Sequence, residues 1–479
     1  MKRIAIVGGG ITGLAAAFTL QQHGYSNFVL LEGSPRWGGK ITSSEQGGFL
    51  TEGGPDSFLS RDRTVQDLCR KLGLGRFLIG SSEGRKATTY VWSRKHLYPM
   101  PEGMMLMTPT MLVPFLKSRL ISWAGKLRMG LEPLIPARGG GDESLASFVR
   151  RRLGREALNK IAAPLMAGIH GADPERLSLR STFPMFVEME RSHKSLVRAM
   201  MKKSQLAKSK GHVAVAGPMF ASLRGGMQQL IEALLAELPP YALRTGCEVK
   251  KVFPERGRYR MELSDGEILL ADEIVFATPA SATAGMVQAA SPLLAMRLRT
   301  IPYASTANVS LGFHRADIHH PMQGSGFLVP QTEGRRITAC SWSSQKFDHR
   351  APEDCVLLRV FIGGATAEAL ARQSDEALIA MARDELRTIM GIDAEPVMAR
   401  ACRWQKAMPQ YEVGHATRVR QIELALETLP GLSIAGSSYY GAGIPSCIAS
   451  GVHAAETVIG HIEESIPDFR REAVFAGKE

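Results

Sequence analysis

The fold of this chain is decided by the stretch Ile4-Ala5-Ile6-Val7-Gly8-Gly9-Gly10-Ile11-Thr12-Gly13, which a mostly apolar run extends to Gln22. This order predicts a buried strand, a glycine turn and a helix. Gly8, Gly10 and Gly13 match the pattern G-x-G-x-x-G. The first glycine turns sharply, the second leaves space for a phosphate, and the third lets the helix pack on the strand. The N–H groups from Gly10 to Gly13 would then face a pyrophosphate at the helix N-terminus.

A second apolar strand is predicted at Phe28-Val29-Leu30-Leu31, directly before Glu32. In dinucleotide-binding domains an acidic residue about 20 residues after the glycine turn accepts a ribose hydroxyl. Glu32 lies near that offset. A glycine turn alone can be purely structural, but strand, turn, helix, strand and acid together predict a dinucleotide site in an α/β domain.

Composition sets the class of protein. The 479 residues are enough for about two or three domains, and 44% hydrophobic with 22% charged residues is typical of a globular protein. The six cysteines form no CxxC pair and no metal-like cluster, and no signal peptide or targeting segment is recognised. We therefore expect reduced thiols, no metal site and a cytoplasmic location.

The net charge of +12 fits a solvated basic face, an anionic membrane surface or a polyanionic small molecule. No recognition motif accompanies the charge, so we expect no nucleic-acid partner. The longest apolar stretch, residues 103–116, is shorter than the ~18 residues of a spanning helix. Residues 116–129 mix Leu, Ile, Trp and Met with four basic residues. They could lie on a membrane surface or pack on their own domain, and the sequence leaves both readings open.

Five segments follow one another along the chain. Residues 1–94 have the β-α-β pattern described above, and residues 95–210 carry apolar residues at helical spacing. Residues 211–280 combine a helix with three strand-like runs. Residues 281–410 alternate strands with one helix, which predicts a second, sheet-based domain. Residues 411–479 repeat the opening order of strand, glycine-rich loop and helix.

Three further motifs carry a resemblance to a known fold. Residues 35–40 read Pro-Arg-Trp-Gly-Gly-Lys, residues 52–58 read Glu-Gly-Gly-Pro-Asp-Ser-Phe, and residues 435–445 read Ala-Gly-Ser-Ser-Tyr-Tyr-Gly-Ala-Gly-Ile-Pro. With the first glycine motif they resemble the glutathione-reductase-like FAD fold of amine oxidases, phytoene desaturases and porphyrinogen oxidases. The resemblance implies FAD as cofactor.

Three other motifs narrow the resemblance to the oxygen-dependent porphyrinogen oxidases. They are residues 164–179, residues 220–227 and residues 403–415. One departure stands out: His170 occupies a position where relatives usually carry an aromatic residue, and Gly171-Ala172 inverts the usual order of small residues. The fit of substrate near this loop is therefore open.

The resemblance implies an α/β fold with three parts. A discontinuous Rossmann FAD-binding domain would comprise residues 1–94, 211–280 and 411–479. A mixed-sheet substrate-binding domain would comprise residues 281–410. An all-helical insertion, residues 95–210, would close the substrate cavity and provide any membrane contact.

The same resemblance assigns contacts residue by residue. It assigns no catalytic acid or base, because the flavin carries the chemistry. Gly168 and Ile169 would line the substrate cavity. The cofactor contacts would be Gly8, Gly10, Ile11, Thr12 and Gly13 for the pyrophosphate, Glu32 for the adenosine ribose, Val249 for the adenine, Lys40, Gly54, Pro55 and Asp56 for the ribityl chain and flavin side, and Trp404, Gly443 and Ile444 for the isoalloxazine ring.

The implied reaction is the six-electron oxidation of a porphyrinogen, with dioxygen as acceptor and hydrogen peroxide as product. Coproporphyrinogen III, with four propionates, is favoured over protoporphyrinogen IX, with two. Arg61 is the expected carboxylate anchor, because a guanidinium fork suits carboxylates, although it could equally be a surface ion-pair partner. A flavin amine oxidase and a non-catalytic flavoprotein remain as alternatives. The oligomeric state is left open.

Overall fold

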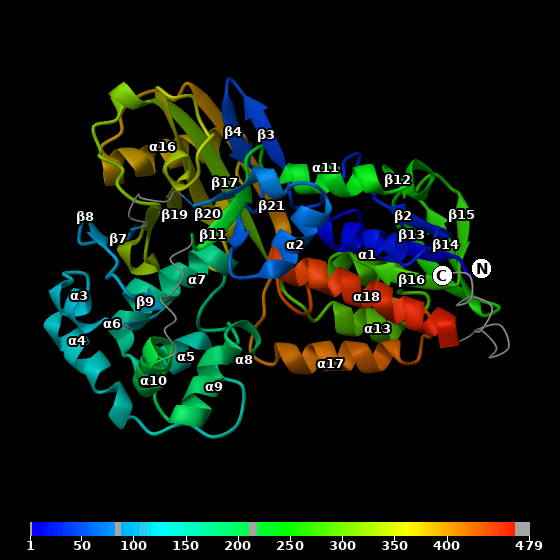
Figure 1. The fold of residues 1–479 in the computed structure, drawn as a ribbon, viewed down its shortest axis with the longest axis horizontal. Coiled ribbons are helices and arrows are strands. Elements are labelled where there is room, and N and C mark those ends of the chain that lie inside the picture. Colours follow the sequence, from blue (N-terminus) through cyan, green and yellow to red (C-terminus); the bar gives the residue numbers. More distant parts are fainter. Residues whose placement is uncertain (1, 82–87, 106, 110, 210–217, 465–479) are drawn as a thin grey trace.

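The computed structural model describes residues 2–81, 88–105, 107–109, 111–209 and 218–464. One half of the molecule is built around a parallel sheet, and the other half combines a mixed sheet with a group of helices (Figure 1). The fold is therefore α/β, with a mixed sheet beside the parallel one. None of the helices in the described ranges combines the length and the apolar character that crossing a bilayer requires.

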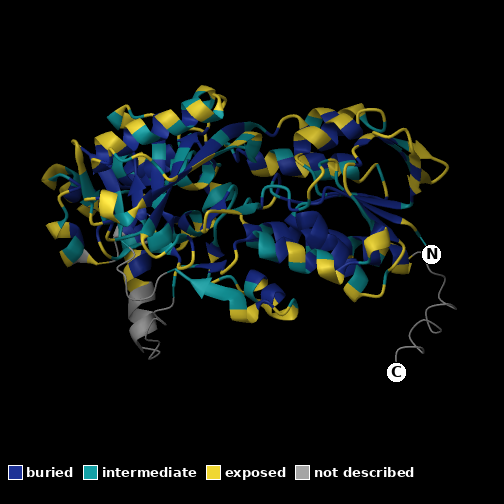
Figure 2. Ribbon diagram, turned by 90° about the horizontal axis from the view of Figure 1, so that it is seen from above, coloured by how far each residue is buried: buried dark blue, intermediate teal, exposed yellow. Residues whose placement is uncertain are grey.

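The parallel sheet draws its strands from three distant parts of the chain. Its order is β12-β2-β1-β16-β22, and every neighbouring pair is parallel. β1, β2 and β16 are buried along their whole length (Figure 2), as expected for strands covered on both faces. The strands are β12 (Leu243–Arg244), β2 (Phe28–Leu31), β1 (Ile4–Val7), β16 (Glu273–Phe276) and β22 (Leu432–Ile434).

Each face of this sheet has its own hydrophobic core. Residues of three long helices and α2 form one core with the sheet, and α1 and α18 lie side by side there (Figure 1). The other core lies against a three-stranded antiparallel sheet and three more helices. The elements are α1 (Ile11–Gln22), α2 (Arg63–Lys71), α11 (Gln228–Glu237) and α18 (Ile444–Glu464) in the first core, and β13 (Val249–Glu255), β14 (Arg258–Leu263), β15 (Ile268–Ala271), α12 (Ala280–Met286), α13 (Pro292–Leu298) and α17 (His415–Leu426) in the second.

The second sheet has seven strands in the order β21-β17-β20-β19-β18-β7-β8. It is mixed, because β18 pairs with β7 in parallel while the other pairs are antiparallel. Helix α16 (Asp375–Met390) shares its hydrophobic core. The strands are β21 (Met398–Pro409), β17 (Tyr303–His314), β20 (Cys355–Gly363), β19 (Ile337–Trp342), β18 (Gly326–Leu328), β7 (Thr89–Ser93) and β8 (His96–Pro99).

Residues 95–210 are not wholly helical, which corrects the sequence prediction. β8 pairs with β7 across a turn at Arg94 and Lys95, so the expected boundary between residues 94 and 95 divides one hairpin of the seven-stranded sheet. β9 (Met104–Met105) and β10 (Thr108–Pro109) form a second, two-residue ladder. Cross-strand pairing decides the structure of β8, β9 and β10, which precede the first run of apolar residues at helical spacing. The longer helices that follow are α3 (Leu112–Lys117), α4 (Trp123–Gly130), α5 (Leu145–Arg152), α7 (Ala163–His170), α9 (Pro184–His193) and α10 (Leu196–Ser209).

A buried ion-pair network joins these helices. Arg152 has no exposed surface, and its guanidinium lies 3.1 Å from a carboxylate oxygen of Glu132 and 2.6 Å from one of Glu190. Glu132 also accepts the N–H groups of Leu196 and Val197 and so caps the start of α10. Because removing one partner of such a network leaves an uncompensated buried charge, these contacts fix how the helices pack.

Two short sheets connect the halves. β3 and β4 form a hairpin that leads into residues 53–56, and β11 pairs with both β5 and β6. These connections place residues 53–56 between the parallel sheet and the mixed sheet. Their bounds are β3 (Ser43–Gln46), β4 (Phe49–Glu52), β5 (Phe58–Leu59), β6 (Leu78–Gly80) and β11 (Phe220–Leu223).

Candidate functional site

The glycine turn between β1 and α1 has the geometry of a phosphate cradle. A Cβ atom on Gly13 would lie 1.9 Å from the carbonyl oxygen of Gly8, so only glycine permits this approach of helix to strand. Gly8 itself has a φ of +111°, in the region that favours glycine. A Cβ on Gly10 would meet nothing nearer than Gly39 Cα, at 3.9 Å. No side chain in the described part of the protein caps α1, so its first N–H groups are available to a phosphate.

Glu32 is held at the end of β2 beside this turn. Its carboxylate accepts the N–H of Gly9 at 2.7 Å and the N–H of Ser34 at 2.8 Å. A carboxylate has about four acceptor positions, so two remain for hydroxyl donors. Val249 lies two residues after Cys247, whose N–H donates to the carbonyl of Glu32. The structure therefore brings Glu32 and the start of β13 together beside the glycine turn.

Lys40 is a partly buried cation between the two ends of the chain. Its Nζ donates to Ser437 Oγ at 3.4 Å, and burial lowers the pKa of the ammonium group. Within the described residues no carboxylate forms an ion pair with it. The N–H of Gly38, in the same loop, donates to the carbonyl of Gly9 at 2.9 Å. A partly buried ammonium beside a phosphate cradle fits an anionic dinucleotide.

The C-terminal motif completes this side of the site. A Cβ on Gly451 would lie 2.2 Å from the carbonyl oxygen of Thr12, so α18 crosses α1 in close contact. The hydroxyl of Tyr411 donates to the carbonyl of Ser437 at 2.7 Å and accepts the N–H of Gly441 at 2.8 Å. These bonds shape the loop that leads through Gly443 to the first turn of α18, where Ile444 is buried.

Residues 53–56 form a loop that is clamped from two sheets. The indole N–H of Trp404 and the side-chain amide of Asn308 both donate to the carbonyl of Gly53, each at 2.7 Å. Arg359 donates from Nη2 to the carbonyl of Gly54 at 2.6 Å. A Cβ on Gly54 would lie 1.7 Å from the carbonyl oxygen of Lys40, so this loop packs directly on the Lys40 backbone. Trp404, Gly54 and Lys40 are thus close together, as the resemblance implied.

A cluster of buried charges lies behind this loop. Burial by itself would raise the pKa of Asp56, but Lys346, 2.9 Å away, and Arg359 hold that pKa well below its usual range. Burial raises the pKa of Glu52 to about 7, although hydrogen bonds and two arginines oppose the rise. Arg350 is 2% exposed and donates to Ser222 Oγ. Glu52, Asp56, Arg350 and Arg359 line a closed cavity of about 10 Å³, about the size that one water needs.

The three cations of this cluster, Arg350, Arg359 and Lys346, were missed in the sequence. Lys346 and Arg359 lie 290 and 305 positions after the loop residues that they contact, and Arg350 donates to residues 222–224, which lie 126 to 128 positions before it, so no local pattern connects them. One signal was available. Arg359 interrupts the otherwise apolar run from Val356 to Ile362, which is unusual in a strand buried on both faces.

The expected substrate residues lie elsewhere. Gly168 faces Leu328 and Ala339 of the mixed sheet, with a Cβ at 3.3 Å from Leu328 Cδ2, and Ile169 is half exposed. Arg61 is exposed in the turn between β5 and α2. No hydrogen bond or ion pair in the described part of the chain connects Arg61 with the end of α7.

His170 ends α7, and burial lowers the pKa of its imidazole. Its carbonyl accepts the side-chain amide of Gln410 at 3.3 Å, and its ring packs edge-on against Phe183. The side chain is therefore held by packing as a neutral group.

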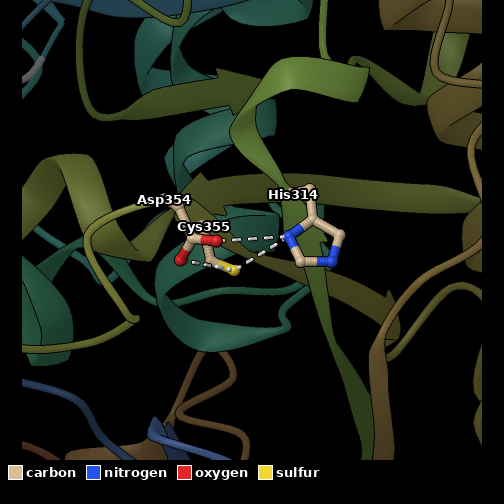
Figure 3. A group of neighbouring side chains, drawn as sticks. All are labelled: His314, Asp354 and Cys355. Atoms are coloured by element: carbon tan, nitrogen blue, oxygen red, sulfur yellow. Dashed lines mark hydrogen bonds and ion pairs between the residues drawn. The ribbon is translucent and has the colours of Figure 1, made fainter.

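One group in the described ranges has the composition of a metal site, namely His314, Asp354 and Cys355 (Figure 3). His314 Nδ1 lies 3.5 Å from Asp354 Oδ2 and 3.6 Å from Cys355 Sγ. The thiol donates to Asp354, and burial together with this bond raises its pKa. His314 is six residues along β17 from Asn308, or about 20 Å at ~3.3 Å per residue. His314, Asp354 and Cys355 therefore lie far from Asn308 and the loop that it contacts, and we assign them no part in the site.

Comparison with known proteins agrees with this geometry. Residues 11–459 match the model of the family described as flavin containing amine oxidoreductase. The chain is 36% identical to the coproporphyrinogen III oxidase of Bacillus subtilis, over 96% of this chain and 98% of that protein. It is 27% identical to the mitochondrial protoporphyrinogen oxidase of Nicotiana tabacum, over 98% and 97%. A crystal structure from Exiguobacterium sp. 255-15, provisionally assigned as a protoporphyrinogen oxidase, superposes with a TM-score of 0.84 at 32% identity, covering 96% and 99%.

The chain belongs to the flavin-containing amine oxidoreductase family. Within that family its relatives at about a third identity are porphyrinogen oxidases, and it is one of them. Its cofactor is FAD. The phosphate cradle at Gly10 and the partly buried Lys40 fit that cofactor.

Proposed function

We propose that this chain oxidises coproporphyrinogen III to coproporphyrin III in haem biosynthesis. Three molecules of dioxygen would accept six electrons and six hydrogens and leave as three molecules of hydrogen peroxide. The observation that carries this proposal is the 36% identity, over nearly the whole length of both chains, to a coproporphyrinogen III oxidase. Two further relatives with that name are each 33% identical.

The parts of the fold would divide the work. Residues 1–94 without β7, together with residues 211–280 and 411–479, would form a glutathione-reductase-like FAD domain, because they supply the parallel sheet and the phosphate cradle. Residues 281–410 would form the substrate domain, whose sheet β7 and β8 join, and the part of residues 95–210 that follows β8 would close the cavity between them. Gly168 supports this division, since it packs on the mixed sheet from the helical side.

Individual residues would hold the cofactor in the roles that the resemblance assigns. The glycine turn and the N-terminus of α1 would bind the pyrophosphate, and the free acceptor positions of Glu32 would take ribose hydroxyls. Lys40 would neutralise anionic charge in a site that excludes water. Bound FAD supplies two-electron oxidation of a C–H bond. The remaining contacts would come from Ile11, Thr12, Pro55, Asp56, Val249, Trp404, Gly443 and Ile444.

A direct assay tests the substrate. We would measure the appearance of porphyrin fluorescence in air from the four-carboxylate and the two-carboxylate porphyrinogen. Faster turnover of coproporphyrinogen III supports the proposal. Faster turnover of protoporphyrinogen IX would replace it with the second candidate, which the 27% identity to the tobacco protoporphyrinogen oxidase favours. Oxidation of a primary amine, with neither porphyrinogen oxidised, would indicate a flavin amine oxidase instead.

Arg61 is proposed as an anchor for a substrate propionate. In Arg61→Ala the KM for the four-carboxylate substrate should rise more than the KM for the two-carboxylate one. Arg63→Ala is the matched control, because Arg63 is also exposed and lies two residues away. Equal effects of Arg61→Ala on both substrates would remove it from this role.

We also propose that α3, α4 and the turn after them contact the inner face of the cell membrane. Trp123 and Leu127 are 72% and 69% exposed, and Leu134 is 76% exposed. Lys117 and Arg119 are exposed in the same stretch, so the face combines apolar and basic side chains. Trp123→Ser with Leu127→Ser should reduce sedimentation with anionic vesicles. Equal sedimentation of the variant would contradict this contact.

A further inference from the structure

Arg359 lies at the centre of the buried charge cluster and touches the loop of residues 53–56. Its side chain is 5% exposed. Nη2 donates to the carbonyl of Gly54 at 2.6 Å, and Nε donates to Asn308 Oδ1 at 3.2 Å. Asn308 in turn donates to the carbonyl of Gly53 at 2.7 Å. Two adjacent carbonyls of the loop are therefore held by one connected pair of side chains from β20 and β17.

The charges that face Arg359 come from several elements. Asp56, on the loop itself, forms an ion pair with Lys346 of α14 (Ser343–Lys346). Glu52 ends β4, and Arg350 follows α14. With Arg359 this makes three cations against at most two carboxylates, because Glu52 exchanges its proton near neutral pH. The cluster therefore carries a net charge of +1 to +2 in a largely buried region.

This charge lies close to the proposed flavin contacts. Gly54 and Trp404 are assigned to the flavin side. Gly54 belongs to the loop and accepts a hydrogen bond from Arg359, and Trp404 donates to Gly53 of the same loop. A cation near a group that gains electrons stabilises the reduced form, and the effect is larger in a site of low dielectric. The guanidinium fork also fixes the position of the loop, since it makes two directed hydrogen bonds.

We propose that Arg359 is a positioning residue with two effects on the bound flavin: it clamps the loop of residues 53–56 through the Gly54 carbonyl, and its buried charge makes the flavin easier to reduce. This proposal rests on FAD being bound where the proposed function places it. It concerns the cofactor alone and does not depend on which porphyrinogen is oxidised.

Two substitutions separate the effects. Arg359→Met removes both the charge and the hydrogen bonds, whereas Arg359→Lys keeps the charge and loses the fork. Arg400→Met is the matched control. Ser310 of β17 pairs with Arg359 of β20 on one side and with Arg400 of β21 on the other. Arg400 is exposed, so the control removes one arginine charge at the same level of the sheet but outside the buried cluster.

The test is the midpoint potential of the bound flavin, measured by reduction against a reference dye without any porphyrinogen. In Arg359→Met the equilibrium for flavin reduction should fall at least tenfold, which is about 30 mV for a two-electron couple. In Arg359→Lys the equilibrium constant for flavin reduction should stay within tenfold of the wild-type value, but FAD should dissociate faster. Arg400→Met should match the wild type in both measurements. An unchanged potential in Arg359→Met, or an equal shift in Arg400→Met, would overturn the charge effect.

A second variant tests the clamp even if Arg359→Met does not fold. Asn308→Ala removes the other half of the clamp without changing any charge, so FAD should dissociate faster at an unchanged potential. If both Asn308→Ala and Arg359→Lys retain FAD as the wild type does, the clamp is refuted. Because these readouts use no substrate, they fail or succeed independently of the porphyrinogen assay.

Discussion

Glu52 offers the sharpest prediction, because its protonation depends on folding. The side chain is 4% exposed, with one oxygen accepting the N–H of Met227 at 2.9 Å and the other the hydroxyl of Ser43 at 2.7 Å. Burial raises its pKa from 4.5 to about 7, against the opposing effect of Arg350 and Arg359. Between these two values the unfolded chain loses its proton while the folded protein keeps it. The stability of the folded protein therefore falls as the pH rises through this window.

The size of the effect follows from that shift. At about 1.36 kcal/mol per pKa unit, a change from 4.5 to about 7 corresponds to about 3 kcal/mol. Glu52→Gln removes the titration while preserving both contacts: the amide oxygen can accept from Met227, and the amide N–H can donate to Ser43 Oγ. The unfolding entropy is ~2.1 cal/mol/K per residue, so in a chain of this length a change of about 1 kcal/mol in the free energy of unfolding shifts the Tm by about 1 °C. The variant should therefore gain about 3 °C in Tm relative to the wild type between pH 5 and pH 8.5.

The assay is thermal unfolding of the FAD-loaded protein across this pH range. Glu45→Gln is the control, because Glu45 is exposed on β3 of the same hairpin and meets water in both states. Its Tm should stay parallel to that of the wild type. If the Tm of Glu52→Gln also changes with pH in parallel with that of the wild type, Glu52 does not hold its proton in the folded protein and the reasoning is refuted.

Three further outcomes are expected. Gly13→Ala should abolish FAD binding, seen as loss of flavin absorbance, because its Cβ would lie 1.9 Å from the carbonyl oxygen of Gly8. Trp404→Phe should lower the stability by only about 1 kcal/mol, since the carbonyl of Gly53 keeps its bond from the Asn308 amide. Arg152→Met should lower it by about 3–5 kcal/mol, measured as Tm, because it leaves the buried carboxylate of Glu132 without its ion-pair partner, while Glu190 keeps only its pair with Arg151.

Matched controls make these outcomes decisive. Gly285→Ala should leave FAD binding unchanged, because a Cβ there meets nothing within 4 Å. Arg150→Met, an exposed neighbour of Arg152, should change the Tm little. Retained flavin in Gly13→Ala would contradict the steric account of the turn. A Tm loss in Arg150→Met equal to that in Arg152→Met would contradict the role of burial.

The sequence by itself determined the cofactor half of this protein. The glycine turn lies within residues 8–13, where Gly8, Gly10 and Gly13 set its shape. The backbone conformation of such a short turn depends on local sterics alone. Glu32 follows from the length of the intervening helix and strand. From the motifs at residues 52–58 and 435–445 we proposed further flavin contacts, and the structure brings both motifs beside Lys40.

Only the tertiary structure decided what surrounds that cofactor. β8 is a strand because β7 offers it a partner, although residues 95–210 as a whole were expected to be helical. Arg359 and Lys346 reach the loop of residues 53–56 because β20 and α14 pack beneath it. The pKa values of Glu52 and Asp56 shift in opposite directions. Burial is the largest effect on both, but at Glu52 it prevails, whereas at Asp56 the opposing effects of Lys346, Arg359 and the hydrogen bonds together outweigh it. Such effects depend on distances through space between residues far apart in the chain, and those distances exist only once the sheets have packed.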